Sequence, residues 1–365
     1  MSIATDAGRW KYVKASSRFN REEFYARQIV MPELGRKGQE RLRRSKVVVV
    51  GLGGLGTVSS LYLALAGVGH LRLIDQDTVE LNNLHRQILY SLNNVRYPKV
   101  EAAADRIGQM NPSVKVEPIA ENVRESNVDK LVSGADCIVD GLDNMRTRYV
   151  LNRASVRHKI PYVFGAAIGI EGNLSVFSPP TTPCLECILP NLDDRYLPTC
   201  NVRGVLGATA GIIGTMQAME AIKLLSGMDD SLKSKLLVCD FRDMYFVAID
   251  IFKRPNCPVC GKNAEKQAES VIKEEGLALL CGRDTCNVNP SKPIRVSLNE
   301  FYERLKPRFK VLVKSSFVVV FQYDSSIEVS LFNGGRMLIK NVKDEEAALK
   351  VHKAILETLG LKEAN

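Results

Sequence analysis

The sequence lacks the apolar N-terminal core that a secretory signal requires. Its first 20 residues are polar and contain the single tryptophan of the chain, Trp10. Signal peptides depend on a short apolar segment ahead of a cleavage site, so we expect no secretion by that route. We expect residues 1–20 to form a flexible tail on a cytoplasmic protein.

No uninterrupted apolar run of membrane-spanning length occurs either. The nearest approach, 205–225, is broken by Gln217, Glu220 and Lys223, and charged groups are rare in membrane spans. We therefore expect no membrane span and predict a buried helix, which can lie close to a neighbouring element through its small residues Gly207, Gly211 and Gly214.

The chain also has no basic motif interleaved with aromatic residues, although its formal net charge is +9. The basic residues at 36–44 are typical of a solvated helical face, so we expect no nucleic-acid partner. With 365 residues, 45% of them hydrophobic, the chain is long enough for about two domains with a sizeable core.

What the sequence does contain is a glycine-rich turn between a β-branched run and an apolar helix. Residues 46–50 read as a strand, and the turn places glycine at Gly51, Gly53, Gly54 and Gly56. Such a turn lets backbone N–H groups and a helix N-terminus face phosphate. The pattern alone fits a dinucleotide-dependent dehydrogenase as well as an ATP-dependent enzyme.

Charged residues after the glycine turn distinguish between these two classes of enzyme. Asp75 ends a second predicted strand, where a carboxylate accepts hydrogen bonds from ribose hydroxyls. Arg86 and Lys99 supply two cations, and Asp143 supplies a hard oxygen ligand after a later strand. A dehydrogenase does not need this cluster, whereas it suits a magnesium-bound triphosphate. Alternatively, each charge is an ordinary surface group or strand-end cap.

Taken together, these segments resemble the ubiquitin-activating superfamily of adenylating enzymes, which includes the molybdopterin-pathway and thiamine-pathway sulfur-carrier adenylyltransferases and stand-alone prokaryotic activating enzymes. The resemblance runs from about Phe24 to about Cys260. It rests on five segments: Tyr25-Ala-Arg27-Gln28, Gly51-Leu-Gly-Gly-Leu-Gly56, Asn82-Asn83-Leu-His-Arg86-Gln87, Tyr97-Pro-Lys99 and Gly141-Leu-Asp143-Asn144.

The resemblance implies a function for each matching position. Asp75 is expected to hold the ribose, while Asn83 and Arg86 hold the phosphates. Lys99 is expected on the phosphate chain and Asp143 on magnesium. These assignments suit the residue types, because guanidinium grips phosphate with two bonds and a carboxylate binds a hard cation.

The resemblance further implies a homodimer in which Arg27 reaches the phosphates of the partner subunit. Asn144, next to Asp143, is counted with the nucleotide-binding residues. The expected fold is α/β: a Rossmann-like, mostly parallel sheet in an adenylation domain over residues 21–262.

Four of the nine cysteines form two Cys-x-x-Cys pairs, at Cys184 and Cys187 and at Cys257 and Cys260. Two such pairs make a tetrahedral thiolate site for zinc, which would tie a central loop to the end of the domain. Unligated thiols and disulfides are the alternatives, and disulfides are rare in a reducing compartment.

Cys200 lies in a polar connection ahead of the apolar helix, where helix N–H groups and Arg203 could stabilise a thiolate. An inert loop cysteine is the alternative. In the family that the chain resembles, this crossover connection bears the cysteine that attacks the acyl-adenylate, so Cys200 is a catalytic candidate.

The remaining cysteines carry no assigned chemistry. Cys137 and Cys239 lie in apolar strands and are expected to be small buried hydrophobes. Cys281 and Cys286 have a spacing that specifies neither a metal nor a disulfide, and packing is the default reading for both.

The C-terminal part begins after a charged, helix-like segment, and we assign residues 263–292 to a linker. Residues 293–365 are predicted to form a small α+β module with a helix over 297–305, a tight turn over 333–335 and a last helix that Asp344 caps and that runs to about residue 359. Its strands are predicted at four places: 309–313, 317–323, 326–331 and 336–340.

This module is too short for a rhodanese domain and has no cysteine after Cys286, so persulfide chemistry within the chain is not expected. The module could dock a conjugating enzyme or the modifier. A stabilising or dimerising appendage is the alternative.

The sequence thus predicts ATP-dependent adenylation of the C-terminal carboxylate of a small β-grasp, ubiquitin-like protein ending in Gly-Gly. A thioester on Cys200 and transfer to a conjugating enzyme would follow. The alternative is a sulfur-carrier protein adenylyltransferase in molybdopterin, thiamine or tRNA thiolation. Two other classes, a dinucleotide-dependent oxidoreductase and a non-catalytic scaffold, leave the charged cluster unexplained.

Overall fold

The fold is described from a computed structural model, which places residues 19–197, 203–228, 231–262, 264, 277–279, 285–290, 294 and 297–361. These residues form two units, each built on its own sheet. The first unit comprises the described residues from 19 to 264, and the second unit those from 277 to 361. Residues 1–18 of the N-terminal tail and the charged segment 265–276 lie outside the described residues.

The first unit contains an eight-stranded sheet in the order β3-β2-β1-β4-β5-β6-β7-β8. The first five strands in this order are parallel and the last three antiparallel. The strands are β1 (Lys46–Val50), β2 (His70–Ile74), β3 (Lys115–Ile119), β4 (Cys137–Asp140), β5 (Tyr162–Ile168), β6 (Glu171–Phe177), β7 (Lys235–Asp240) and β8 (Tyr245–Asp250). The predicted Rossmann-like, mostly parallel sheet is confirmed.

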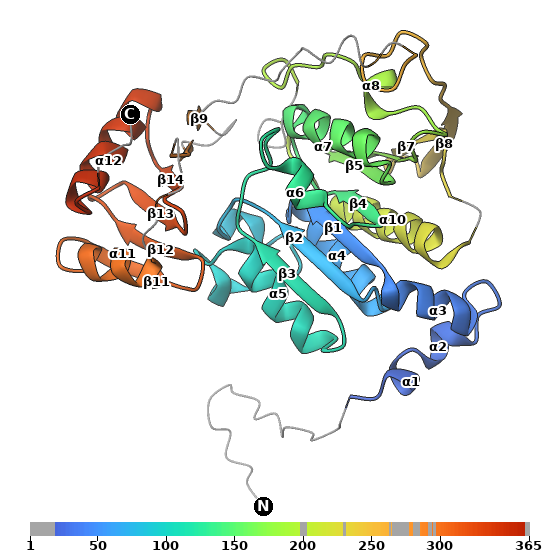
Figure 1. Ribbon diagram of the computed structural model, residues 1–365, viewed down its shortest axis with the longest axis horizontal. Coiled ribbons are helices and arrows are strands. Elements are labelled where there is room, and N and C mark those ends of the chain that lie inside the picture. Colours follow the sequence, from blue (N-terminus) through green and yellow to red (C-terminus); the bar gives the residue numbers. More distant parts are fainter. Residues whose placement is uncertain are drawn as a thin grey trace, which may run out of the picture.

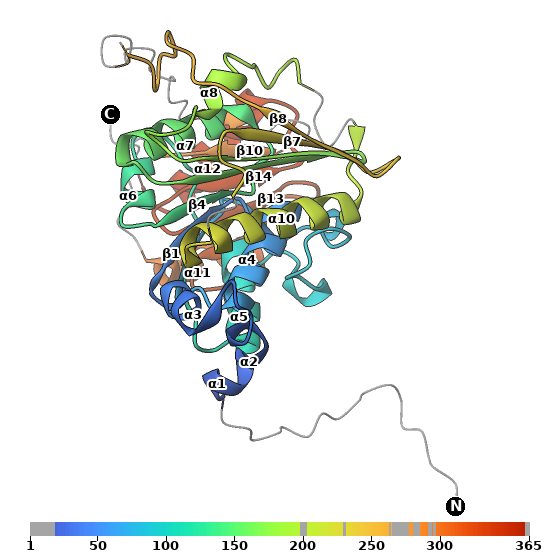
Figure 2. The same ribbon diagram turned by 90° about the vertical axis from the view of Figure 1, so that its right-hand side faces the viewer.

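Helices cover both faces of this sheet, because its central strands are apolar on both sides. One face packs against α3 (Gly35–Arg44), α4 (Gly54–Ala66), α5 (Lys99–Met110) and α10 (Gly207–Ser226). The other packs against α6 (Val128–Val132) and α7 (Met145–His158). Figure 2 shows these two layers below and above the sheet. Short helices complete the unit: α1 (Arg21–Phe24), α2 (Ala26–Ile29), α8 (Leu185–Ile188), η1 (Leu81–Asn83) and η2 (Leu92–Asn94).

The apolar helix α10 lies directly against α4, as its small residues predict. A Cβ on Gly214 would come within 2.6 Å of the carbonyl oxygen of Leu55, so only glycine permits this approach. Gln217 is fully buried on the same helix. Among the described helices, none combines the length and the apolar character needed to cross a bilayer.

The second unit contains a six-stranded antiparallel sheet in the order β11-β12-β13-β14-β10-β9. Its elements are β9 (Leu277–Leu279), β10 (Thr285–Val288), α11 (Leu298–Leu305), β11 (Lys310–Lys314), β12 (Val318–Gln322), β13 (Glu328–Phe332), β14 (Met337–Lys340) and α12 (Glu345–Thr358). Asp344 caps α12 by accepting a hydrogen bond from the N–H of Ala347, as predicted.

Two strands of this sheet were not expected. The charged composition of 263–292 predicts a linker, yet β10 pairs with β14 and β9 pairs with β10. The linker assignment is therefore wrong for these strands. Both are short, so their pattern is too brief to identify, and the long-range pairing with β14 gives them their structure.

Both faces of the second sheet are covered. Helices α11 and α12 pack on one face, around Phe301 and Ile355. The other face carries Val318, Val320, Phe332 and Leu338, which pack with Ala120 at the end of β3. Figure 1 shows the second unit, in orange to red, beside β3 and α5 and far from β8.

Candidate functional site

A pocket of about 600 Å³ lies at the carboxyl ends of β1, β2 and β4. In an open, doubly wound sheet this is where ligands bind, because the strand order reverses there and leaves a crevice. The structure brings eight of the predicted nucleotide-site residues to its wall: Gly51, Gly53, Gly54, Asp75, Arg86, Lys99, Asp143 and Asn144.

The glycine turn forms the floor of this pocket. Gly51 has φ +86°, and a Cβ there would lie 2.6 Å from the carbonyl oxygen of Gly141. A Cβ on Gly56 would lie 1.8 Å from the carbonyl oxygen of Gly51. Because these glycines carry no side chains, nothing from them covers the first N–H groups of α4, and an anionic ligand can approach those groups.

Asp75 lies at the end of β2 and is nearly buried. Its two carboxylate oxygens accept hydrogen bonds from the N–H groups of Leu52, at 2.6 Å, and Asp77, at 2.7 Å. Each oxygen has a second lone pair that a ribose hydroxyl can use. Burial raises the pKa of this carboxyl above its ordinary value, and Lys99 opposes that rise.

Lys99 begins α5 and is 3% exposed. Its Nζ donates to Asp77 Oδ2 at 2.9 Å and lies 4.0 Å from Asp75 Oδ2. The lysine is thus held between two carboxylates at the pocket wall, a position from which a point charge can face a phosphate chain.

Arg86 reaches the pocket from the loop after η1. Its Nη1 donates to the carbonyl oxygen of Asn82 at 2.7 Å, and its side chain passes close to Gly54 at the start of α4. Asn83 is buried beside it and does not line the pocket. Its side-chain oxygen accepts from the N–H of Glu80, and its Nδ2 donates to Asn82 Oδ1. In this structure Asn83 therefore stabilises the loop that presents Arg86.

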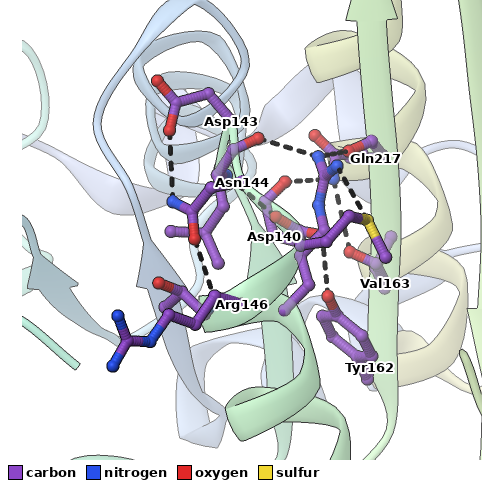
Figure 3. Close-up of polar contacts among 12 residues, drawn as sticks. Asp140, Asp143, Asn144, Arg146, Tyr162, Val163 and Gln217 are labelled. Atoms are coloured by element: carbon purple, nitrogen blue, oxygen red, sulfur yellow. Dashed lines mark hydrogen bonds and ion pairs between the residues drawn. The ribbon is translucent and has the colours of Figure 1, made fainter. Parts of the chain in front are cut away.

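Asp143 and Asn144 follow β4 at the start of α7. Asn144 caps this helix, since its Oδ1 accepts from the N–H of Thr147 at 2.9 Å. Its Nδ2 donates to Asp143 Oδ1 at 3.3 Å. Asp143 is exposed at the pocket wall, and Figure 3 shows it turned away from the buried cluster around Asp140. This leaves carboxylate oxygen available to a hard cation.

A buried network, which was not predicted from the sequence, lies behind this loop. Asp140 is completely buried, and its Oδ2 accepts from Arg148 Nε at 2.9 Å and from the Tyr162 hydroxyl at 2.7 Å. Gln217 Nε2 donates to the Asp140 carbonyl oxygen at 2.6 Å. Figure 3 shows Tyr162 and Gln217 beside Asp140. They hold in place the turn that carries Asp143.

A sequence signal for part of this network was available. Asp140 ends an apolar strand, and Arg148 follows eight residues later on the next helix. A carboxylate buried at a strand end requires a cation or several donors, and an arginine one turn into the following helix is within reach. Tyr162 and Gln217 come from distant segments that no local pattern connects.

Arg27 lies on α2 and is exposed, and it does not line the pocket of its own chain. The expectation that it acts across a dimer stays a prediction. Cys200 lies outside the described residues. Arg203, which was expected near it, forms an ion pair with Glu171 at 2.8 Å.

Four sulfur atoms converge at a second site, where α8 meets the segment after β8. The Sγ atoms of Cys184, Cys187, Cys257 and Cys260 all lie within 4.8 Å of one another. The shortest separations, 3.4 and 3.6 Å, are too long for disulfide bonds. A zinc tetrahedron with Zn–S bonds of about 2.3 Å has S–S edges of about 3.8 Å, so the cluster fits zinc.

The other cysteines that the structure describes are buried. Cys137 in β4 and Cys239 in β7 are at most 1% exposed, as predicted, and burial raises the pKa of the Cys137 thiol to about 12. Cys286 lies in β10 within the core of the second unit. Cys281 lies outside the described residues.

Comparisons with known proteins identify the family of the first unit. Residues 25–259 match the model of the ThiF family. The chain is 41% identical over 256 residues to the SAMP-activating enzyme E1 of Haloferax volcanii, covering 70% of this chain and 94% of that protein. It is 39% identical over 252 residues to the sulfur carrier protein adenylyltransferase of Thermus thermophilus, covering 67% and 93%.

Two further similarities are partial. The chain is 42% identical over 241 residues to the adenylyltransferase and sulfurtransferase MOCS3 of Culex quinquefasciatus, covering 66% of this chain but only 55% of that protein. Among solved structures, Escherichia coli MccB has a TM-score of 0.60 at 24% identity, covering 67% of this chain and 74% of that one. The latter supports the fold alone.

The family model matches well over half of the chain, and the matched range ends among the cysteines of the second pair. It includes the glycine turn, the charged residues of the pocket and the Asp140 network, and it excludes the second unit. The resemblance recognised in the sequence is confirmed, and the chain belongs to the ThiF family.

Proposed function

We propose that this protein uses ATP to adenylate the C-terminal carboxylate of a small β-grasp protein ending in Gly-Gly. One observation carries the proposal: the glycine turn, Asp75, Arg86, Lys99 and Asp143 line the same pocket. A nicotinamide-dependent reaction has no use for two cations and a carboxylate beside the phosphate turn. The catalytic domain would span residues 21–262.

The reaction requires stabilisation of charge on a triphosphate. An oxygen of the partner's carboxylate attacks the α-phosphorus of ATP, the bond to the bridging oxygen breaks, and pyrophosphate leaves with that electron pair. The product is an acyl-adenylate. The N–H groups at the start of α4, together with Arg86 and Lys99, would neutralise the phosphates as charge shifts toward the leaving group.

Magnesium would be held by Asp143, whose exposed carboxylate at the pocket wall suits a hard cation. Bound there, the ion would withdraw charge from the phosphate oxygens. Asp75 would hold the ribose. Arg27 would reach the phosphates of a second copy in a homodimer, which fits its exposed position away from its own pocket.

The zinc cluster would be structural. All four sulfurs point at one another, which leaves no open coordination position for a reacting water. The metal would fasten α8 to the segment after β8 and so keep the crossover connection anchored on one side.

Among the possible fates of the adenylate, the comparisons favour the sulfur-carrier reading. The relatives are named SAMP-activating enzyme E1, sulfur carrier protein adenylyltransferase, and adenylyltransferase and sulfurtransferase MOCS3. The thioester on Cys200 and transfer to a conjugating enzyme rest on the sequence resemblance alone, since Cys200 lies outside the described residues. We therefore propose the sulfur-carrier adenylyltransferase as the principal function.

The test is ATP–pyrophosphate exchange in the presence of candidate β-grasp partners. The full chain should catalyse partner-dependent exchange, and removal of the partner's last glycine should abolish it. Asp143→Ala should lose exchange at least 100-fold, while Asp129→Ala, a surface carboxylate on α6, should retain it. Absence of exchange with every Gly-Gly partner, under conditions where ATP binds, would overturn the proposal.

Non-reducing gels then distinguish a sulfur-carrier adenylyltransferase from an enzyme that forms a thioester for conjugation. A sulfur-carrier adenylyltransferase that needs no thioester should give no partner adduct sensitive to thiol, and Cys200→Ala should exchange at the wild-type rate. A thiol-sensitive adduct that Cys200→Ala abolishes, and that passes to a cysteine of a second protein, would establish conjugation instead.

A further inference from the structure

The second unit lies against the pocket through specific polar contacts rather than as a loose appendage. Arg336, which precedes β14, donates from Nη2 to the carbonyl oxygens of Gln76, at 2.8 Å, and Ala120, at 3.2 Å. These two carbonyls belong to the segments that leave β2 and β3. The arginine is 6% exposed and stacks on the Phe332 ring at 3.7 Å, so it is held from both sides.

Ion pairs at the same boundary reinforce this placement. Arg96 pairs with Glu328 at 2.6 Å, and Lys340 pairs with Glu80 at 3.3 Å. Lys340 also donates to the Thr78 hydroxyl at 3.1 Å. Since Ala120 packs with the apolar face of the second sheet as well, both apolar and polar contacts fix this sheet beside the end of β2.

The second unit reaches the pocket itself. Asn287 in β10 and Asn289 just beyond it line the pocket, and alternate residues of an extended chain share a face. Asn287 is 2% exposed, and its Oδ1 accepts from Arg336 Nη1 at 3.2 Å. Asn289 is half-buried. Arg336 thus connects the strand that carries Asn287, and that leads into Asn289, to the segment after Asp75.

The position of these amides indicates which part of a nucleotide they would meet. Asp75 at the end of β2 marks the ribose, while the glycine turn and Arg86 mark the phosphates. The second unit contacts the segments after β2 and β3, which is the ribose side. An uncharged amide, with one acceptor and two donors, matches a base edge or a ribose hydroxyl rather than a phosphate.

We infer that the second unit is the nucleoside-side wall of the nucleotide pocket and that Asn289 hydrogen-bonds the base or ribose of the bound nucleotide. This inference rests on the proposed function, because it requires that the pocket bind ATP. It gives the C-terminal unit a part in the first step of the reaction, in place of a docking arm for a conjugating enzyme.

The test uses the full-length chain and calorimetric titration with ATP, AMP and tripolyphosphate. Asn289→Ala should weaken ATP and AMP binding by the same factor, about 3- to 10-fold for one neutral hydrogen bond. Tripolyphosphate, which has no nucleoside, should bind both proteins equally. Asn299→Ala is the matched control, because Asn299 is an exposed amide on α11 of the same unit and its loss should change nothing.

Each outcome is decisive. Unchanged ATP and AMP affinity in Asn289→Ala would overturn the inference alone, provided that the wild-type chain binds ATP. Equal weakening of tripolyphosphate would also overturn it, since the contact would then not be to the nucleoside. If Asn289→Ala melts below wild type, the uncharged and nearly isosteric Asn289→Leu is titrated in its place. A wild-type chain that binds no ATP would overturn the proposed function, and this inference with it.

Discussion

The Lys99 ammonium group lies 2.9 Å from the carboxylate of Asp77, with both side chains shielded from solvent. Asp75 is 4.0 Å away on the other side. A cation between two carboxylates stabilises the fold and also lines the nucleotide pocket, so its substitution should affect both properties.

Lys99→Met should lower ATP–pyrophosphate exchange at least 100-fold and destabilise the fold by about 3 kcal/mol, because two shielded carboxylates lose their cation. Urea denaturation measures the second effect. Lys99→Arg keeps the charge and should recover most of the stability. Full exchange activity in Lys99→Met would remove this residue from the mechanism.

The stability deficit of Lys99→Met should also depend on pH. Burial raises the pKa of Asp75, and loss of the lysine should raise it further. A carboxyl with a raised pKa in the folded state binds protons more readily than in the unfolded chain, so it costs stability as the pH rises through the interval between the two values. The deficit should therefore be largest at pH 7 and shrink as the pH falls into the ordinary carboxyl range. A deficit independent of pH would show that charge is not its cause.

Substitution of Asp143 should affect mainly catalysis, whereas substitution of its neighbour Asn144 should affect mainly stability. Asp143→Ala removes an exposed carboxylate, so the free energy of unfolding should change by less than about 0.5 kcal/mol. ATP–pyrophosphate exchange should nevertheless be lost. Asn144→Ala removes the cap of α7 and should cost about 1 kcal/mol of stability. A magnesium titration of exchange provides the check. If Asp143→Ala retains both rate and metal dependence, the proposed magnesium ligand is wrong.

The buried pair of Asp140 and Arg148 should be essential for folding. Arg148→Met leaves a fully buried carboxylate without its cation, and we expect a loss of about 3–5 kcal/mol. Arg157→Met on the same helix α7 is the control. Its partner Asp129 is half-exposed, so removal of that pair should cost at most about 1 kcal/mol. Similar losses in both variants would contradict the importance assigned to the buried network.

Removal of zinc should loosen the first unit. We expect one zinc per chain by elemental analysis, and a chelator or Cys257→Ser should lower the melting temperature and release the metal. Cys286→Ala is the matched control, because this thiol is buried in the second unit, away from the cluster, and the variant should keep its zinc. A chain that contains no metal and melts normally with chelator would exclude a zinc site.

Local patterns were sufficient where neighbouring residues make the structure. The glycine turn after β1, the Asp344 cap of α12 and the four predicted strands of the second sheet are all found. The cysteine pairs also converge as their spacing predicts. In each case the decisive contacts are short in sequence or follow from a known coordination geometry, so the order of residue types carries the information.

Long-range packing determined the features that local patterns did not predict. It recruited β9 and β10 into the second sheet, surrounded Asp140 with Arg148, Tyr162 and Gln217, and placed Asn289 at the pocket. The amino-acid sequence by itself determined which strands, turns and caps form and which side chains carry chemistry, because those depend on backbone sterics and nearby partners. Only the tertiary structure decided which surface the C-terminal unit covers, because an apolar strand face and an arginine do not specify which distant carbonyls and side chains will cover them.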